Sequence, residues 1–311
     1  MIDALSKAAF GALAGSAALK RLASRYGMRG DGSFARRFVA GEHIDQAIAA
    51  ARAIEAQGLS QTLDLLGESV ASEAEASAAT AAYLAMMPRI AEAGIGRNIS
   101  IKLTQLGLDL SPQLAGRHLE SILRRARDDA FFVRVDMENS PYVEATLTLV
   151  EHAWHAGLAN VGVVLQSALK RSEADLERVL ALGMRVRLVK GAYKEPASLA
   201  WQSKSEVDAA YVRMLERLLR RGQFPAIATH DPAMIAEARR IATSCGLASS
   251  AFEFQMLYGV RRDLQASLAH EGFGVRVYIP YGREWFPYFM RRLGERPANI
   301  GFVLKSLWRE R

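Results

Sequence analysis

Eight short apolar runs alternate with longer segments of helical periodicity, and this alternation limits the possible folds more than any other feature. The runs are residues 62–66, 99–103, 131–136, 161–165, 186–190, 226–229, 252–255 and 275–279. Between them, apolar residues recur with the 3.6-residue spacing of helices that bury one face. Strands that alternate with helices in this way favour a parallel sheet joined by crossover helices.

The number of units distinguishes between the two common parallel architectures. Eight units in about 250 residues match the size of a (βα)8 TIM barrel. A doubly wound sheet would need fewer strands and usually a glycine-rich phosphate loop after the first one, whereas Gly94-Ile95-Gly96 precedes a strand here. We therefore expect an α/β fold, with a (βα)8 barrel at residues 58–311 that follows an N-terminal helical arm at residues 1–57.

Cysteine content and hydropathy indicate the compartment. The chain has one cysteine, Cys245, so an intramolecular disulfide is impossible and a reducing cytoplasm fits. The longest apolar-leaning run, residues 8–19, is shorter than the roughly 20 residues that a bilayer span requires. The start of the chain also lacks the basic region of a secretory signal. We expect a cytoplasmic protein.

The formal net charge of +7 is concentrated at both ends of the chain, where residues 1–40 and residues 283–311 each hold seven Lys and Arg. A nucleic-acid partner would require basic residues interleaved with exposed aromatic residues or a recognisable binding helix, and the sequence has neither. Solvated helix faces are one interpretation. Attraction to an anionic membrane surface is the other.

Polar residues follow the apolar runs at the ends where a barrel carries its chemistry. They are Glu68, Lys102, Thr104, Asp136, Glu138, Gln166, Arg187, Lys190, Thr229, His230, Glu253, Gln255 and Tyr278. Satisfying loop backbone would explain one or two of these residues but not a set at all eight ends. A non-catalytic barrel that acts as a scaffold is therefore disfavoured.

Several of these residues are charged and lie within apolar strands. Arg187 and Lys190 belong to a run that a parallel sheet would bury on both faces, so an anion from a cofactor or substrate is expected to compensate them. Lys102 and Asp136 lie on adjacent expected strands. We expect these two to pair and to form oppositely charged walls of a pocket, although a purely structural pair is the alternative.

A helix beyond the last run carries the adjacent arginines Arg291 and Arg292, which point about 100° apart. One of them could reach into the barrel mouth while the other bonds an acid such as Glu295 or Glu68. Paired guanidinium groups suit a small carboxylate. A solvated basic helix face is the alternative.

The histidines indicate no metal site. His152 and His155 are three residues apart, but no third ligand accompanies them. His230 follows Thr229 where a strand meets the start of a helix, a position at which backbone N–H groups and a hydroxyl bind phosphate. Serine-hydrolase chemistry is not expected, because the Gly-x-Ser-x-Gly elbow is missing.

Taken together, these motifs resemble the proline dehydrogenases, specifically the short bacterial monofunctional branch, in which a distorted TIM barrel binds FAD. The matching stretches are residues 63–68, 99–106, 133–138, 164–167, 187–193, 228–232, 252–259, 278–282 and 291–295. The resemblance implies oxidation of L-proline to Δ1-pyrroline-5-carboxylate by hydride transfer to the flavin N5 atom, the first step of proline catabolism to glutamate. It also implies a membrane quinone as electron acceptor.

The resemblance assigns roles to individual residues. For FAD it implies contacts with Met137, Gln166, Arg187, Lys190, Gly191, Ala192, Thr229 and His230, with Arg187 near N5 and Gln166 bonded to the flavin ring. For proline it implies a carboxylate clamp by Arg291 and Arg292, helped by Lys102, with Tyr278 over the ring. Asp136 would orient this charged set and, with Arg187, be catalytic.

The segment after Tyr193 reads Lys194-Glu195-Pro196, as in the monofunctional branch. A separate pyrroline-5-carboxylate dehydrogenase is then implied downstream, and the basic termini could bring the enzyme to the inner face of the membrane. Two alternatives stay open. One is a dehydrogenase that prefers hydroxyproline, against which Tyr278 argues; the other is a Schiff-base lyase with Lys102 or Lys190 as nucleophile.

Overall fold

A closed barrel of eight parallel strands forms the centre of the molecule in the computed structural model, which describes residues 33–294. The strands are β1 (Ser60–Leu65), β2 (Asn98–Ile101), β3 (Phe132–Val135), β4 (Val161–Gln166), β5 (Arg185–Val189), β6 (Ala226–Ala228), β7 (Glu253–Leu257) and β8 (Gly274–Tyr281). They pair in chain order, and β8 closes the barrel on β1. The expected α/β barrel is confirmed, and every expected run forms a strand whose ends lie within two residues of the expected ones. The expected place of Glu253 at the rim is wrong, because β7 continues to Leu257 and Glu253 lies at its start.

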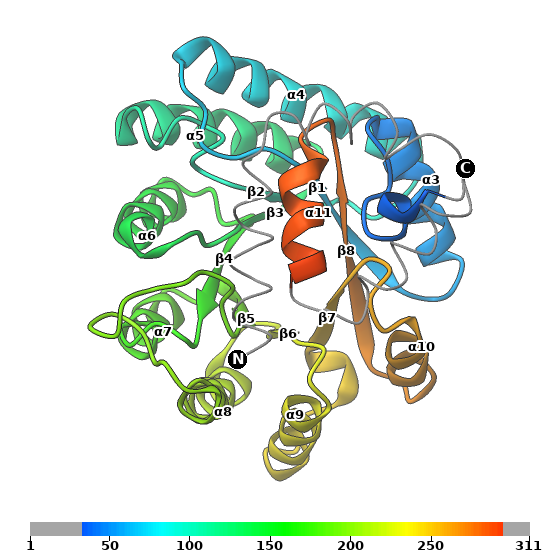
Figure 1. Ribbon diagram of the computed structural model, residues 1–311, viewed down its shortest axis with the longest axis vertical. Helices are drawn as coiled ribbons and strands as arrows, with labels where there is room; N and C mark the ends of the chain where they lie inside the picture. Colours follow the sequence, from blue (N-terminus) through cyan, green and yellow to red (C-terminus); the bar gives the residue numbers. More distant parts are fainter. Residues whose placement is uncertain (1–32, 295–311) are drawn as a thin grey trace.

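Helices surround the strands, as Figure 1 shows. They are α3 (Ile44–Glu55), α4 (Glu73–Glu92), α5 (Pro112–Asp128), α6 (Ser140–His155), α7 (Ser172–Ala181), α8 (Lys204–Arg221), α9 (Pro232–Ser244), α10 (Arg262–His270) and α11 (Trp285–Gly294), with short 3-10 helices η1 (Phe34–Arg37) and η2 (Ser249–Ala251). Ser111 caps α5 and Asp231 caps α9 by accepting hydrogen bonds from backbone N–H groups of the first turn.

The two faces of the barrel sheet differ in chemistry. Leu63, Ile99 and Val133 are fully buried in the apolar core shared with the surrounding helices. The other face is polar, because Arg187 on β5 bonds Ser100 on β2 and Gln255 on β7, which only side chains inside the barrel could do. Barrel interiors are usually filled by branched apolar residues. This one instead contains a network of paired charges and hydrogen bonds.

The segment before β1 contributes to the barrel core. Ala47 and Ala51 of α3 are fully buried in the main apolar core. Residues 1–32 of the expected arm and residues 295–311 lie outside the described residues, and so do most of the basic residues at the two ends of the chain. The boundary between arm and barrel at residue 57 stays a prediction.

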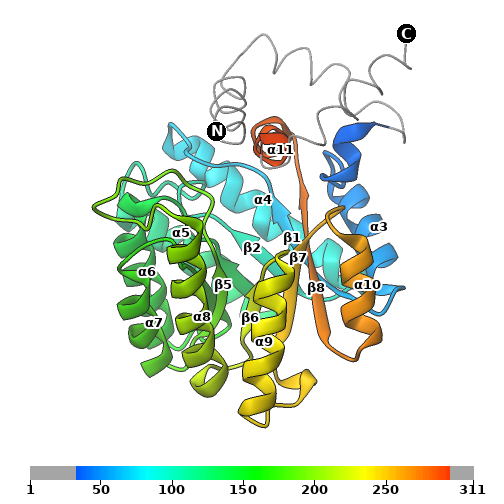
Figure 2. The same ribbon diagram turned by 60° about the horizontal axis from the view of Figure 1, so that its bottom comes forward.

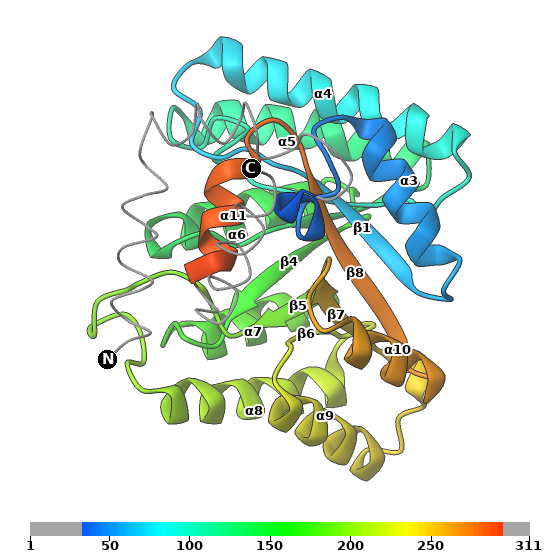
Figure 3. The same ribbon diagram turned by 45° about the vertical axis from the view of Figure 1, so that its right-hand side comes forward.

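Helix α11 lies over the carboxyl ends of the strands (Figure 2). It begins only four residues after the carboxyl end of β8, so the short connection keeps it at that rim. Trp285 and Phe286 pack with Ala35 and Val39 in a second apolar cluster, and Figure 3 shows η1 beside α11. The Trp285 Nε1 atom also donates a hydrogen bond to Glu42 Oε1 at 3.1 Å. These contacts fix α11 at the mouth of the barrel.

Within residues 33–294, no helix combines the length and the apolarity that crossing a bilayer requires.

Candidate active site

Asp136, Arg187 and Tyr278 meet at the centre of the barrel mouth. Arg187 Nη1 donates to Asp136 Oδ1 at 2.6 Å, and the Tyr278 hydroxyl donates to Asp136 Oδ2 at 2.7 Å. The Arg187 guanidinium also lies 5.3 Å from the centre of the Tyr278 ring. Asp136 therefore holds a cation and an aromatic hydroxyl together. The three residues come from different parts of the barrel: Asp136 follows β3, Arg187 lies on β5 and Tyr278 lies on β8.

The guanidinium of Arg187 is bonded through each of its nitrogen atoms. Besides Asp136, it donates from Nη2 to Ser100 Oγ at 3.1 Å and from Nε to Gln255 Oε1 at 2.5 Å. Its side chain is 6% exposed. A buried charge is tolerated when it is paired and fully hydrogen-bonded, and these contacts meet that condition. The result is a positive charge held in one position at the mouth.

The expected pair between Lys102 and Asp136 is wrong. Lys102 Nζ instead lies 3.6 Å from Asp64 Oδ1, while Asp136 is taken by Arg187. The reason is geometric: β2 has β1 as its other neighbour, so Asp64 approaches Lys102 from that side, and the long Arg187 side chain reaches Asp136 across β4.

Burial and charge act in opposite directions on this cluster. Burial alone would lower the pKa of Lys102, but the carboxylates of Asp64 and Asp136 outweigh that effect and raise it. Burial raises the pKa of Asp64 more than the charge of Lys102 lowers it. Lys102 therefore stays protonated and supplies a second cation near the mouth.

Asp64 is a residue of the candidate site that reasoning from the sequence missed. It lies within the motif at residues 63–68, but no role was expected for it. It is fully buried, at 0% exposure. A carboxylate inside the apolar run at residues 62–66 was the signal that could have identified it, since a buried acid requires a cationic partner.

A second group of polar residues lies beside the centre, at the ends of β2, β3 and β4. Gln166 Nε2 donates to the backbone oxygen of Glu138 at 2.7 Å. The Glu138 carboxylate in turn accepts hydrogen bonds from the Thr104 hydroxyl at 2.6 Å and the Thr104 backbone N–H at 3.2 Å. Met137, which directly precedes Glu138, is 7% exposed.

The loop after β5 approaches Gln166 closely at Gly191. The φ of Gly191 is +111°, and an added Cβ atom would lie 3.2 Å from Gln166 Oε1. Such a backbone conformation and close approach both favour glycine. Ala192 is exposed next to it. This part of the mouth is therefore formed by backbone and small side chains.

Lys190, the first residue of this loop, lies close to the residues that follow β6. Lys190 Nζ lies 2.7 Å from Asp231 Oδ2 and also forms a close ion pair with Asp208. The anions that compensate Arg187 and Lys190 are thus carboxylates of the protein itself, not the expected cofactor or substrate. The Thr229 hydroxyl accepts a hydrogen bond from the Asp231 backbone N–H at 3.1 Å. His230 Nε2 accepts one from the Leu257 backbone N–H at 3.0 Å, which links β6 to β7.

Helix α11 adds two arginines. Arg291 donates to Glu68 through Nη1 at 2.8 Å and Nη2 at 3.4 Å, so the expected contact with Glu68 is confirmed. Burial would raise the pKa of Glu68, but the charge of Arg291 outweighs it and lowers that pKa. The Arg292 guanidinium lies 5.3 Å from the centre of the Tyr288 ring. The other expected acid, Glu295, lies outside the described residues.

The described residues thus form a mouth with a paired central cation, a second buried cation at Lys102 and two arginines on α11. Such an arrangement can bind an anionic small molecule and stabilise negative charge that develops above Arg187. Among residues 33–294, no three His, Cys, Asp or Glu side chains are grouped so as to hold a metal ion.

Comparisons with known proteins agree with one another. The family model described as proline dehydrogenase matches residues 47–305. Proline dehydrogenase 1 of Bacillus subtilis is 41% identical over 289 residues, which are 93% of this chain and 94% of that protein. The proline dehydrogenase of Deinococcus radiodurans is 41% identical over 282 residues, covering 88% of this chain and 90% of that one.

Solved structures give the same result for the fold. Proline utilization A (PutA) from Bdellovibrio bacteriovorus, in a structure inactivated by N-propargylglycine, matches with a TM-score of 0.78 and 25% identity. The match covers 83% of this chain and 32% of that one, so this chain spans about a third of the PutA protein. By the family model that its sequence matches and by these relatives, the chain belongs to the proline dehydrogenase family.

Proposed function

We propose that this protein oxidises L-proline to Δ1-pyrroline-5-carboxylate with FAD as its cofactor. The observation that carries the proposal is the fixed Arg187 guanidinium at the barrel mouth, which is bonded to Asp136, Ser100 and Gln255. A stationary cation is the group that a reaction building negative charge on its acceptor requires. The relatives named proline dehydrogenase support the choice of substrate.

The residues around Arg187 fit FAD. Gln166 presents an amide, and Gly191, which has no side chain, lets a ligand approach the backbone closely. Next to the N-terminus of α9, Lys190 supplies a cation, Thr229 a hydroxyl and His230 an imidazole. Helix N-termini and such donors suit a phosphate. When bound, FAD would supply the acceptor for a hydride. We place Met137 and Ala192 in the same site.

Arg187 would stabilise the negative charge that forms during the reaction. Because its contacts hold it in place before the reaction, little reorganisation is required at that moment. Asp136 keeps the guanidinium in position through a 2.6 Å contact, and the same carboxylate holds the Tyr278 hydroxyl. Asp136 therefore orients both the cation and the ring that would cover proline.

Lys102, Arg291 and Arg292 would bind the substrate carboxylate. Lys102 is kept protonated by the neighbouring carboxylates, and Arg291 offers a planar guanidinium on α11. Since Arg291 already bonds Glu68, a bound carboxylate would share or replace that contact. The carboxylate thereby determines which way the proline ring faces.

The two alternatives are less well supported. A Schiff-base lyase requires an unprotonated lysine, but the pKa of Lys102 is raised and Lys190 lies between two carboxylates. A preference for hydroxyproline would require open space beside the substrate ring. The Tyr278 side chain is held at the mouth by Asp136, which disfavours that space.

The resemblance to the proline dehydrogenases also implies the further steps. Electrons would pass to a membrane quinone, and a separate pyrroline-5-carboxylate dehydrogenase would oxidise the product. The seven Lys and Arg in each terminal region support peripheral contact with the inner face of an anionic membrane. The protein would otherwise remain in the cytoplasm.

Absorbance spectra of the purified protein test the proposal. A flavin spectrum that bleaches on anaerobic addition of L-proline is expected, whereas pyrrolidine, which lacks the carboxylate, should bleach it far less. Borohydride should trap no covalent adduct between proline and Lys102. A colourless protein, or a flavin that L-proline leaves oxidised, would refute the proposal.

A further inference from the structure

We propose that Gln255 is a positioning residue for Arg187, and that an ion pair between Glu253 and Arg276 near the opposite end of the barrel anchors it. The inference rests on the proposed function for the role of Arg187, but the contacts that carry it are independent of that role. Gln255, Glu253 and Arg276 lie outside both the cofactor set and the substrate set described above.

The contacts form one continuous chain through the barrel. Arg187 Nε donates to Gln255 Oε1, and Gln255 Nε2 donates to Glu253 Oε1, each at 2.5 Å. Arg276 Nε donates to both oxygens of Glu253, at 2.9 and 3.1 Å. The chain thus runs from the catalytic mouth toward the amino ends of the strands.

Only one orientation of the Gln255 amide satisfies these contacts. A guanidinium cannot accept a hydrogen bond and a carboxylate cannot donate one. The amide oxygen must therefore face Arg187 and the amide nitrogen must face Glu253. The negative charge of Glu253 consequently determines which side of Gln255 is presented to Arg187.

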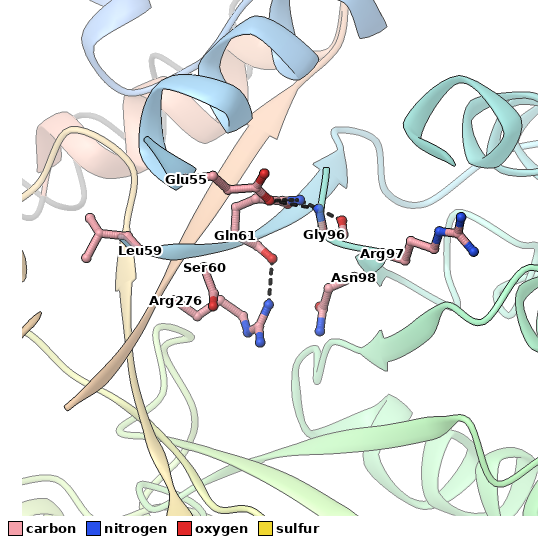
Figure 4. A pocket seen from close by; sticks show the side chains of 8 residues that line it. All are labelled: Glu55, Leu59, Ser60, Gln61, Gly96, Arg97, Asn98 and Arg276. Carbon is pink, nitrogen blue, oxygen red and sulfur yellow. Dashed lines mark hydrogen bonds between the residues drawn. The ribbon is translucent and has the colours of Figure 1, made fainter. Parts of the chain in front are cut away.

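Glu253 is itself held in place. It is 3% exposed, and burial would raise its pKa, but the charge and hydrogen bonds of Arg276 together with Gln255 outweigh burial and lower it. Arg276 is fixed in turn, because its Nη1 atom donates to the backbone oxygen of Gln61 at 2.7 Å. Figure 4 shows this contact in a pocket at the start of β1. The start of β1 lies at the end of the barrel opposite α11 (Figure 2).

The position of Arg187 depends on its Nε contact. Asp136 and Ser100 hold the two terminal nitrogen atoms, and Gln255 accepts the hydrogen bond of Nε, the guanidinium nitrogen closest to the backbone. Without that third contact, the guanidinium could turn about its attachment while keeping one bond to Asp136. A displacement of about 1 Å at a reacting centre can cost about 100-fold in rate.

The variant Gln255→Met tests the proposal, because it keeps the length of the side chain and removes both amide contacts. Gln61→Met is the matched control, because Gln61 is also a buried glutamine whose side chain bonds Gly96 and Glu55. Only its backbone oxygen contacts Arg276, and the substitution keeps that oxygen. In FAD-loaded protein we expect Gln255→Met to slow anaerobic flavin reduction by proline about 10- to 100-fold. It should also lower the flavin midpoint potential, and we expect Arg187→Met to lower it in the same direction.

A double-mutant cycle separates positioning from a general effect on the barrel. In the Arg187→Met background, Gln255→Met should change neither the rate nor the potential further, because no guanidinium remains to be positioned. Effects of equal size in both backgrounds would overturn the proposal. So would a Gln61→Met variant that matches Gln255→Met in rate and potential.

Two further measurements keep the test decisive. If Gln255→Met does not fold, Glu253→Gln replaces it in the same cycle, since it keeps the shape and removes the charge that orients the amide. The midpoint potential is measured without substrate. A protein that proline fails to reduce would therefore refute the proposed function, while the potentials would still decide whether Gln255 acts through Arg187.

Discussion

Arg187 on β5 and Asp136 at the end of β3 form an ion pair across the inside of the barrel, with Nη1 and Oδ1 2.6 Å apart, although β4 lies between the two strands. The pair also carries Tyr278, whose hydroxyl bonds the other Asp136 oxygen at 2.7 Å. Removing one partner of a buried pair leaves the other charge uncompensated. Substitution of either Arg187 or Asp136 should therefore also disturb the position of the remaining partner.

The variant Arg187→Met should lower the rate of flavin reduction by proline far more than it lowers folding. Loss of a fixed charge-assisted donor costs about 2.7–4 kcal/mol of transition-state stabilisation, or about 10²–10³ in rate. Stopped-flow reduction of FAD-loaded protein measures this. Arg185→Met is the control, because Arg185 is the first residue of the same strand and its guanidinium stacks on Phe132 and Phe224. An unchanged rate with FAD bound would remove Arg187 from the mechanism.

Arg291→Lys and Arg292→Lys should each raise the KM for proline, because lysine cannot make the two-pronged contact with a carboxylate. The ratio of activity on proline to activity on pyrrolidine should fall in both variants. Arg283→Lys, an exposed position just before α11, should leave this ratio unchanged. If the two substrates stay as well separated in the variants as in the native protein, these arginines do not bind the carboxylate.

Truncation of Tyr278 to Ser or Ala should weaken the use of proline and improve trans-4-hydroxyproline relative to it. The loss of apolar contact is of the order of 1–3 kcal/mol, and the space released can admit the extra hydroxyl. Tyr278→Phe separates the two parts of the side chain, since it keeps the ring and loses only the bond to Asp136. We expect Tyr278→Phe to retain the preference for proline. Equal losses for both substrates in Tyr278→Ser would show that the ring does not face the substrate.

Glu253 should make the unfolding free energy depend on pH in the acid range. Its pKa lies below the ordinary value of 4.5, because Arg276 outweighs the effect of burial. The unfolded chain then binds more protons than the folded one below that value. The stabilisation is present above about pH 4.5 and is lost as the pH falls through the folded-state pKa.

Urea unfolding of FAD-loaded protein at a series of pH values measures this dependence. Between about pH 6 and about pH 3.5, a range that spans the ordinary glutamate pKa of 4.5, the free energy of unfolding should fall less steeply in Glu253→Gln than in the native protein. Glu92→Gln, which removes an exposed carboxylate on α4, should keep the native slope. Parallel curves for the native protein and Glu253→Gln would contradict the lowered pKa.

The sequence by itself determined the order of the strands and helices and the rim of the barrel at which most of the expected polar residues gather. Both follow from local rules: apolar spacing distinguishes strand from helix, and residues such as Ser111 and Asp231 start helices through hydrogen bonds within one turn. The carboxyl ends of parallel strands meet at one rim. Polar residues after each run were therefore expected to gather there.

Only the tertiary structure decided which of those residues touch. Lys102 pairs with Asp64 instead of Asp136, and Arg187 reaches partners on β2, β7 and the end of β3. Such contacts depend on the register of neighbouring strands and on the width of the closed barrel, which bring together residues far apart in the chain. Local periodicity carries no record of either quantity, so the pairing of charges inside the barrel emerges only when the eight strands close.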